Sequence, residues 1–211
     1  RCCVIGSAIT SSMPSPRTIS PQPPSRLHGG THALDLICYF FDALPLSITA
    51  HMPHPRPDIA ADVVVVSTLR FPGERVATMV MNRISHAPER YFEMRVDCAE
   101  ASLRLSLGGV ARVALDWSAA LGRPILRSSF VRGGEARVEQ RGRSTPLVRE
   151  SRPAFASATA ANLTRFVDAI ERGEHSTDEA RYARELIRVV FSAYESAETG
   201  RTVWLRDAVH A

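Results

Sequence analysis

The chain has 211 residues, of which 45% are hydrophobic and 23% are charged, the composition of an ordinary globular domain. Its 26 basic residues are all arginines, and they give a net charge of +4. The arginines are scattered and have no aromatic platform beside them, so nucleic acid is not expected as a partner. No apolar run reaches the roughly 18 residues of a membrane span, and the first residues do not have the pattern expected of a signal peptide. We therefore expect a cytoplasmic protein that does not contact a membrane.

The four cysteines, Cys2, Cys3, Cys38 and Cys98, have neither the spacing of a metal site nor that of a disulfide framework. We expect them to be reduced and mostly buried.

The first predicted elements are a strand, a loop and a helix. Residues 4–9 form a short apolar run, and the prolines that follow remove amide donors, which predicts a loop. Beyond Gly29 and Gly30, helical spacing predicts an amphipathic helix with Thr31 as its N-cap. Its apolar side has Leu34, Ile37, Cys38 and Phe41, and its polar side has His32, Asp35, Tyr39 and Asp42.

The middle of the chain has the pattern of β-strands. Alternating or β-branched stretches predict strands at residues 47–50, 63–71, 76–84, 91–96 and 103–107, with a tight turn over residues 71–75. The connections between these strands are too short for a crossover helix, so the sheet is predicted to be antiparallel. Residues 117–153 indicate further strands joined by irregular loops.

The end of the chain has two helical patterns and a last strand. Leu163, Phe166, Val167 and Ile170 predict a helix that ends near Gly173. A second helix is expected from Ser176, which forms a capping box with Glu179, to Gly200. Its predicted buried residues are Ala180, Ala183, Leu186, Ile187, Val190 and Tyr194, and Arg181, Arg184 and Arg188 are predicted to face water. Residues 202–205 read as a strand. We divide the chain into a leading strand and loop (1–30), one α+β domain (31–206) and a tail (207–211).

Three motifs occur in the order of one known family. They are VIGSAI at residues 4–9, GGTHALDL at residues 29–36 and AYESAETGR at residues 193–201. Together they resemble the carboxy-terminal domain of the oxidoreductases named for glucose-fructose oxidoreductase, inositol dehydrogenase and the rhizopine catabolism protein, the Gfo/Idh/MocA family. The resemblance extends over residues 4–206.

The resemblance implies a fold, a cofactor and partners. The fold is a mostly antiparallel open sheet with helices on one face, like the C-terminal domain of dihydrodipicolinate reductase. In the full-length enzyme an N-terminal Rossmann domain binds NAD or NADP, a sugar or polyol binds at the domain junction, and a homo-oligomer forms through the sheet. This chain has no Gly-x-Gly-x-x-Gly after a strand and no lysine, so the Rossmann domain is expected to be missing and no cofactor is expected to bind this chain alone.

The resemblance also assigns roles to residues. His32 matches the acid/base or substrate-orienting histidine, and imidazole suits proton transfer near neutral pH. His28, Thr31 and Asp35 are the candidate substrate contacts, and Asp35 can equally hold the start of the helix. His28 departs from the family, because many members have an aspartate at that position.

Two other functions remain open. The chain could be a stand-alone, non-catalytic module for dimerisation or ligand binding. It could also be a metal-dependent hydrolase that uses His28, His32 and Asp35, although Gly29 and Gly30 between the histidines disfavour a continuous helix. We expect no metal site.

Overall fold

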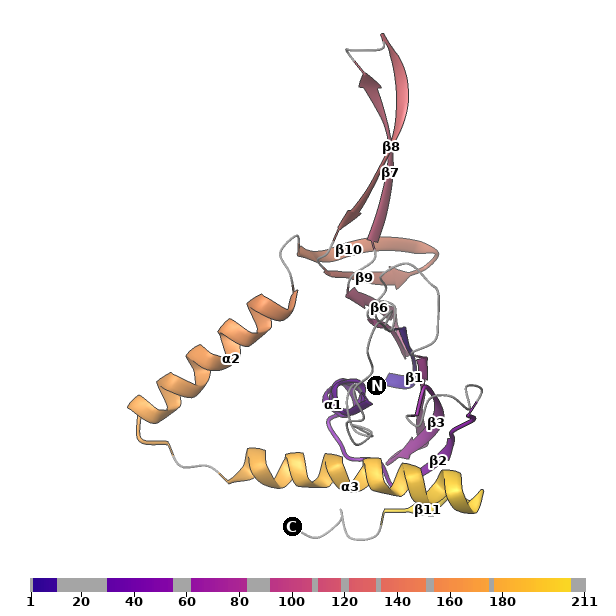
Figure 1. Cartoon of the computed structure of the whole chain (residues 1–211), viewed down its shortest axis with the longest axis vertical. Helices are drawn as coiled ribbons and strands as arrows, with labels where there is room; N and C mark the ends of the chain where they lie inside the picture. The colour runs from indigo at the N-terminus through magenta and orange to yellow at the C-terminus, as the bar shows by residue number, and fades with distance from the viewer. Residues whose placement is uncertain are drawn as a thin grey trace, which may run out of the picture.

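A computed structural model describes residues 2–10, 30–54, 62–82, 92–107, 110–118, 122–131, 134–150, 154–174 and 177–205 (Figure 1). Their elements follow in the order β1 (Cys2–Thr10), α1 (Gly30–Phe41), β2 (Ser47–His51), β3 (Val64–Phe71), β4 (Arg75–Asn82), β5 (Phe92–Cys98), β6 (Ser102–Leu107), β7 (Val110–Ser118), β8 (Arg123–Val131), β9 (Gly134–Gln140), β10 (Arg143–Glu150), α2 (Ala154–Glu171), α3 (Asp178–Thr199) and β11 (Val203–Trp204). The strands and helices predicted from the sequence are all present, and the proline-rich loop lies outside the described residues.

Nine strands form one sheet in the order β10-β9-β6-β5-β1-β4-β3-β2-β11. Neighbouring strands are antiparallel, as predicted, except that β1 runs parallel to β4. This parallel pair is possible because α1, β2 and β3 lie between the two strands in the chain. The leading strand is thus a central strand of the domain sheet. Strands β7 and β8 form a separate two-stranded ribbon that extends away from the sheet (Figure 1).

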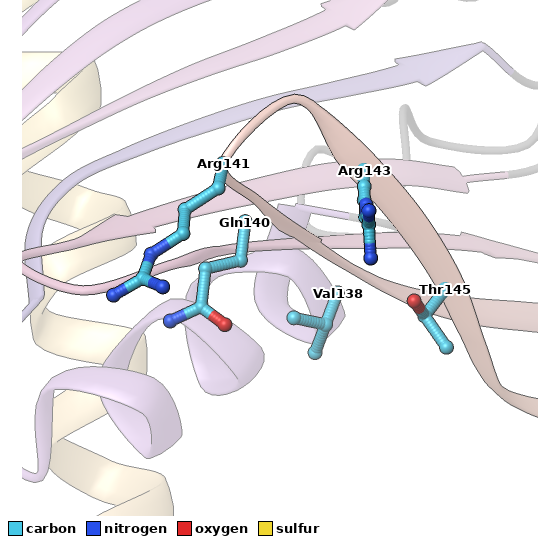
Figure 2. A pocket seen from close by; sticks show the side chains of 5 residues that line it. All are labelled: Val138, Gln140, Arg141, Arg143 and Thr145. Atoms are coloured by element: carbon cyan, nitrogen blue, oxygen red, sulfur yellow. The ribbon is translucent and has the colours of Figure 1, made fainter.

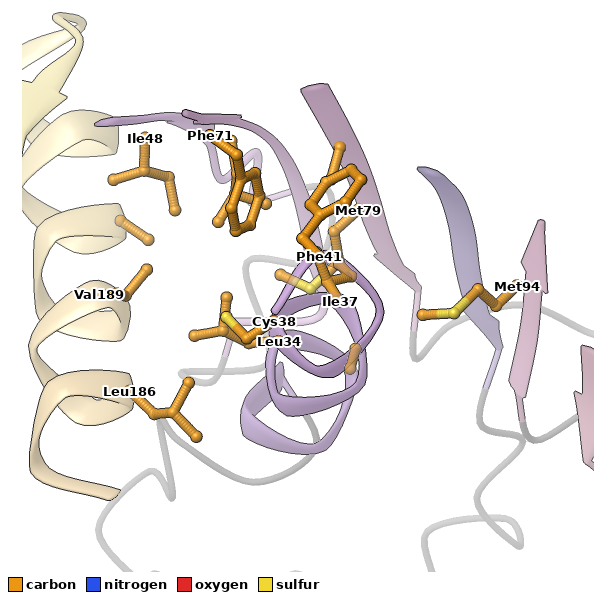
Figure 3. Close-up of a cluster of buried hydrophobic side chains, with 14 of the residues drawn as sticks. Leu34, Ile37, Cys38, Phe41, Ile48, Phe71, Met79, Met94, Leu186 and Val189 are labelled. Carbon is orange, nitrogen blue, oxygen red and sulfur yellow. The ribbon is translucent and has the colours of Figure 1, made fainter. Parts of the chain in front are cut away.

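The hydrophobic core lies between the sheet and the helices α1 and α3 (Figure 3). The predicted apolar side of α1 is buried, including Ile37 and Phe41, and packs toward Phe71 and Met79 of the sheet. Each fully buried side chain of this size contributes about 1.5–3 kcal/mol to stability. The polar side of α1, with His32, therefore faces outward.

The hairpin between β3 and β4 fixes the carboxy-terminal end of α1. Arg75 donates hydrogen bonds to the carbonyl oxygens of Phe41 (2.6 Å) and Pro72 (2.8 Å). A helix end has unsatisfied carbonyls, and a cation there is favourable. At the other end, α1 begins at Gly30, so Thr31 lies inside the first turn, and its prediction as the N-cap was wrong.

Helix α2 ends near Gly173 as predicted, and helix α3 can be compared with the prediction at both ends. The N-cap of α3 is Thr177, and its side chain makes no capping hydrogen bond. Ser176, which was predicted to begin the helix and to form a capping box with Glu179, lies outside the described residues. At the other end, Gly200 has φ 67° and stops the helix as predicted.

The buried side of α3 is formed by Leu186, Val189, Ala193 and Ser196. The predicted set mixed two adjacent faces of this helix. Ala180, Ala183 and Ile187 are exposed, whereas Val190 and Tyr194 are half-buried and the three arginines face water as predicted.

The cysteines are only partly as expected. Cys38 is free and buried. Cys98 is disulfide-bonded, which corrects the prediction that all four thiols are reduced. Cys2 lies opposite Cys98 in the pairing of β1 with β5, and the side chains of Cys2 and Cys3 lie outside the described part of the structure.

Candidate functional site on helix α1

The outward side of α1 presents the predicted site residues. His32 and Asp35 are exposed one helical turn apart, and Thr31 beside them is half-buried. The His32 side chain forms no hydrogen bond or ion pair with any residue that the structure describes. His28 lies outside the described residues. The structure therefore brings together three of the four predicted site residues.

Helix α3 holds the Asp35 carboxylate in place. The Tyr182 hydroxyl donates a hydrogen bond to Asp35 Oδ1 at 2.9 Å, so the observed partner of Asp35 is a tyrosine and not the His32 ring. This contact joins residues 147 positions apart in the chain. Tyr182 was not among the residues predicted from the sequence. The signal that could have indicated it is its position four residues before the buried Leu186, on the side of α3 next to the core.

Burial keeps the groups beneath this face neutral. Burial, and after it the negative charge of Asp35, together raise the pKa of the Cys38 thiol to about 12. Burial also raises the pKa of Tyr182, with its hydrogen bond to Asp35 as the second cause. The thiol and the phenol therefore keep their protons at neutral pH. Imidazole is the side chain on this face whose ordinary chemistry includes proton transfer near neutral pH.

A second polar cluster lies under the closing sequence motif. The Tyr194 hydroxyl donates to Asp62 Oδ2 at 2.7 Å, and His54 Nε2 lies 3.6 Å from Asp62 Oδ1. The buried Ser196 hydroxyl accepts from the Ala50 amide and donates to the Arg201 carbonyl. The tyrosine and serine of this motif thus connect α3 by hydrogen bonds to the sheet and to neighbouring loop residues, which is a structural role.

The face of the sheet opposite the helices is polar. Thr49, Thr68 and Thr78 lie side by side across β2, β3 and β4. Arg95, Arg104 and Arg137 lie side by side across β5, β6 and β9, in a network of ion pairs with their neighbours. The carboxylates of that network are Asp97, Glu93, Glu139 and Glu135. Because these arginines are paired with carboxylates, the face is not a basic patch.

A hollow of about 500 Å³ lies at the turn between β9 and β10 (Figure 2). Its lining residues are Val138, Gln140, Arg141, Arg143 and Thr145. None of the predicted site residues lines it. Over the described ranges, no three His, Cys, Asp or Glu side chains are placed to hold a metal ion. No helix in that part of the chain is long and apolar enough to cross a membrane.

Several solved structures have a fold similar to that of this chain. The chain superposes on an oxidoreductase from Agrobacterium radiobacter, solved with NAD+, L-tartaric acid and magnesium, with a TM-score of 0.71 and 16% identity; the match covers 97% of this chain and 57% of that one. An aldose-aldose oxidoreductase from Caulobacter crescentus, solved with glycerol, gives 0.65 at 16% identity, covering 97% and 56%. A putative NADPH-dependent oxidoreductase from Desulfitobacterium hafniense gives 0.69 at 15% identity, covering 96% and 56%.

These structures share the predicted α+β fold, and the chain spans less than two thirds of their length. No curated protein matches the chain. The model of the GFO/IDH/MocA C-terminal domain matches residues 27–104, which include α1 with His32 and Asp35. The resemblance drawn from the sequence motifs is therefore confirmed, and residues 27–104 match the C-terminal domain of the GFO/IDH/MocA oxidoreductases.

Proposed function

We propose that this chain is the substrate-binding domain of a nicotinamide-dependent oxidoreductase that acts on a hydroxyl group of a sugar, polyol or related compound. The observation that carries the proposal is the exposed His32 on α1, inside the region that matches the family. Solved structures with this fold include proteins crystallised with NAD+ and a hydroxy acid or with glycerol, which agrees with this class of substrate. Its cytoplasmic location remains a prediction from the sequence.

In this proposal His32 accepts and donates the proton of the reacting hydroxyl. When an alcohol is oxidised, its carbon loses a hydride and its oxygen loses a proton as the carbonyl forms. The imidazole of His32 takes that proton and returns it in the reverse reaction. Asp35 is fixed by Tyr182, so its carboxylate is positioned to accept a hydrogen bond from a neighbouring substrate hydroxyl. Thr31 and His28 would complete the substrate contacts.

The described residues do not suit a dinucleotide, which we assign to a further domain. Among the described helices, α2 has the shortest connection from a preceding strand. This connection, from β10 to α2, is Ser-Arg-Pro and contains no glycine. A pyrophosphate cradle needs a glycine-rich turn at the start of a helix. We therefore assign hydride acceptance to a further domain, and proton transfer and substrate contact to α1.

The polar face of the sheet is the surface we assign to self-association. Its threonine row and internally paired charges can meet the same surface of a second copy around a two-fold axis. This observation also supports the second candidate function, a non-catalytic dimerisation module of the same fold.

The test is a chimera in which this chain replaces the matched part of the Agrobacterium radiobacter oxidoreductase. We expect reduction of NAD+ with at least one compound from a panel of L-tartrate, glycerol, glucose and myo-inositol. His32→Asn should lower kcat by about 100-fold or more and leave NAD+ affinity unchanged. His51→Asn is the matched control, because His51 is exposed at the end of β2.

Two results would contradict the proposal. If the chimera binds NAD+ but oxidises nothing in the panel, the chain is not a substrate domain of the proposed class. If His32→Asn and His51→Asn have equal kcat, His32 is not the proton-transfer group.

A further inference from the structure

The hollow at the turn between β9 and β10 is lined by two arginines that have no carboxylate partner. The side chains of Arg141 and Arg143 form no hydrogen bond or ion pair with any residue that the structure describes. The arginines of the neighbouring open face differ from them, because Arg104, Arg137 and Arg149 each form an ion pair with a glutamate. The hollow therefore has two uncompensated positive charges.

The register of the strands separates these charges from the carboxylates. Arg143 lies opposite Gln140 and Thr145 lies opposite Val138, so these four residues share one face of the hairpin. Val138 in turn lies opposite Leu103, which packs against the core, so this is the face of the sheet that carries the helices. Figure 2 shows the lining side chains pointing the same way from the hairpin. Among the described residues, the lining includes no carboxylate.

Arg141 occupies a turn position that arginine does not favour. Arg141 and Gly142 have φ 50° and 74°, the positive values of a two-residue type I′ turn. Asn, Asp and Gly are the favoured residues at the first of these positions, because a longer side chain is strained at positive φ. Strained non-glycine residues occur often at ligand sites. The chain thus has a positive charge at a place where a neutral asparagine would give a more stable turn.

We propose that this hollow binds a small phosphorylated molecule, whose phosphate group contacts Arg141 and Arg143. Two guanidinium groups match the charge of about −2 on a phosphate monoester, and each can donate two parallel hydrogen bonds to its oxygens. The Thr145 hydroxyl can donate a further one. Gln140 is held beside them by its own hydrogen bond to the Glu100 carbonyl at 3.1 Å.

The size of the hollow leaves room for the organic part of the ligand. Its volume of about 500 Å³ lies within the range of roughly 300–1,000 Å³ that is typical of small-molecule sites. A nucleic-acid strand is disfavoured, because no described aromatic side chain lines the hollow to stack on a base. The site is separate from the candidate site on α1, and the inference does not rest on the proposed function.

NMR titration of the chain with phosphate esters tests the site. The panel is glucose 6-phosphate, glycerol 3-phosphate and AMP, each compared with its dephosphorylated counterpart at constant ionic strength. We expect at least one ester to shift the backbone amide signals of residues 138–145, and its counterpart to leave them unchanged. That ester should bind about tenfold or more tightly than inorganic phosphate, because its organic part also contacts the hollow.

Three variants assign the binding to the two arginines. Arg143→Gln should weaken binding of the ester about tenfold or more, because a charged donor is lost. Arg141→Asn should weaken it similarly and leave Tm unchanged or higher, because asparagine suits the turn. Arg123→Gln is the matched control, since Arg123 is an exposed arginine at the start of β8 outside the hollow. Unchanged amide signals in α3 show that each variant is folded.

Several results would overturn the proposal. It fails if no ester of the panel shifts the signals of residues 138–145, or if the dephosphorylated compounds shift them equally. It also fails if Arg143→Gln and Arg123→Gln weaken binding to the same extent. Equal affinity for inorganic phosphate and for every ester that binds would show that the hollow takes the ion alone.

Discussion

At the level of single residues, the buried thiol of Cys38 links stability to pH. The pKa of this thiol is about 12 in the folded chain, against an ordinary value of 9.0, mainly because of burial. Because folding raises the pKa of this thiol, its contribution to stability is fully present below the pKa of the unfolded chain, about 9. That contribution is lost as the pH rises from about 9 toward 12. At pH 9.5 the free energy of unfolding should be about 1 kcal/mol lower than at pH 7.

Urea unfolding of the wild type and of Cys38→Ala at these two pH values checks this prediction. Cys38→Ala should lose most of the decrease, whatever its stability at pH 7. Tyr182 has an ordinary pKa of 10.0 and begins to contribute only at higher pH. An equal pH dependence in both proteins would show that Cys38 is not the responsible group.

The contacts of single side chains were the part that the sequence could not predict. His32 and Asp35 were found because they lie together in one motif and one turn of helix. The partners Tyr182 and Tyr194 bind carboxylates 147 and 132 positions away, and no local pattern reports such pairs. The disulfide at Cys98 was missed for the same reason, because its spacing in the sequence resembles no known framework.

At the level of elements, α1 depends on a side chain from a neighbouring hairpin. Arg75 donates to the last carbonyl of α1 and its guanidinium lies 5.2 Å from the ring centre of Phe41. Arg75→Met should lower the free energy of unfolding by about 1–3 kcal/mol, because a hydrogen bond from a charged donor is lost at the helix end. Chemical denaturation measures this loss.

Arg181→Met is the matched control for Arg75. Arg181 is exposed on α3 and its ion pair with Asp178 is 3.6 Å long, so its replacement should cost at most about 0.5 kcal/mol. Equal losses for the two variants would show that the contact with Phe41 does not hold α1 in place.

The elements themselves were largely predictable, because alternation and helical spacing are local. Strands β2 to β6 follow the alternating pattern closely. The placement of β1 between β4 and β5 was not predictable, since it depends on strands more than sixty residues away. The buried side of α3 was misassigned because this helix has apolar residues on two sides, and only packing shows that Ile187 and Phe191 face outward.

At the level of the whole molecule, the domain has two surfaces of different chemistry. Most of the exposed large hydrophobic residues of the described structure lie on the helices, and the open face of the sheet has a row of threonines and a network of paired charges. Different chemistry implies different partners, since an apolar surface gains from burial in a domain interface and a polar one can form a wetter contact between copies. One domain can therefore offer different surfaces to different partners.

We expect two copies of the chain to form a dimer through the open face of the sheet, and this dimer should bury Trp204. Trp204 is 58% exposed, and Arg70 of the same face lies 5.7 Å from its ring centre. In a Trp117→Phe background, fluorescence should shift to shorter wavelength as concentration rises, and sedimentation should show a dimer. Thr68→Arg, in the middle of the threonine row, should weaken the dimer about tenfold or more, because it adds an unpaired charge to the contact. Thr164→Arg on α2 adds the same charge outside the sheet and should have no effect on the dimer. If Thr164→Arg weakens the dimer and Thr68→Arg does not, the two copies contact each other through the helices and not through the sheet.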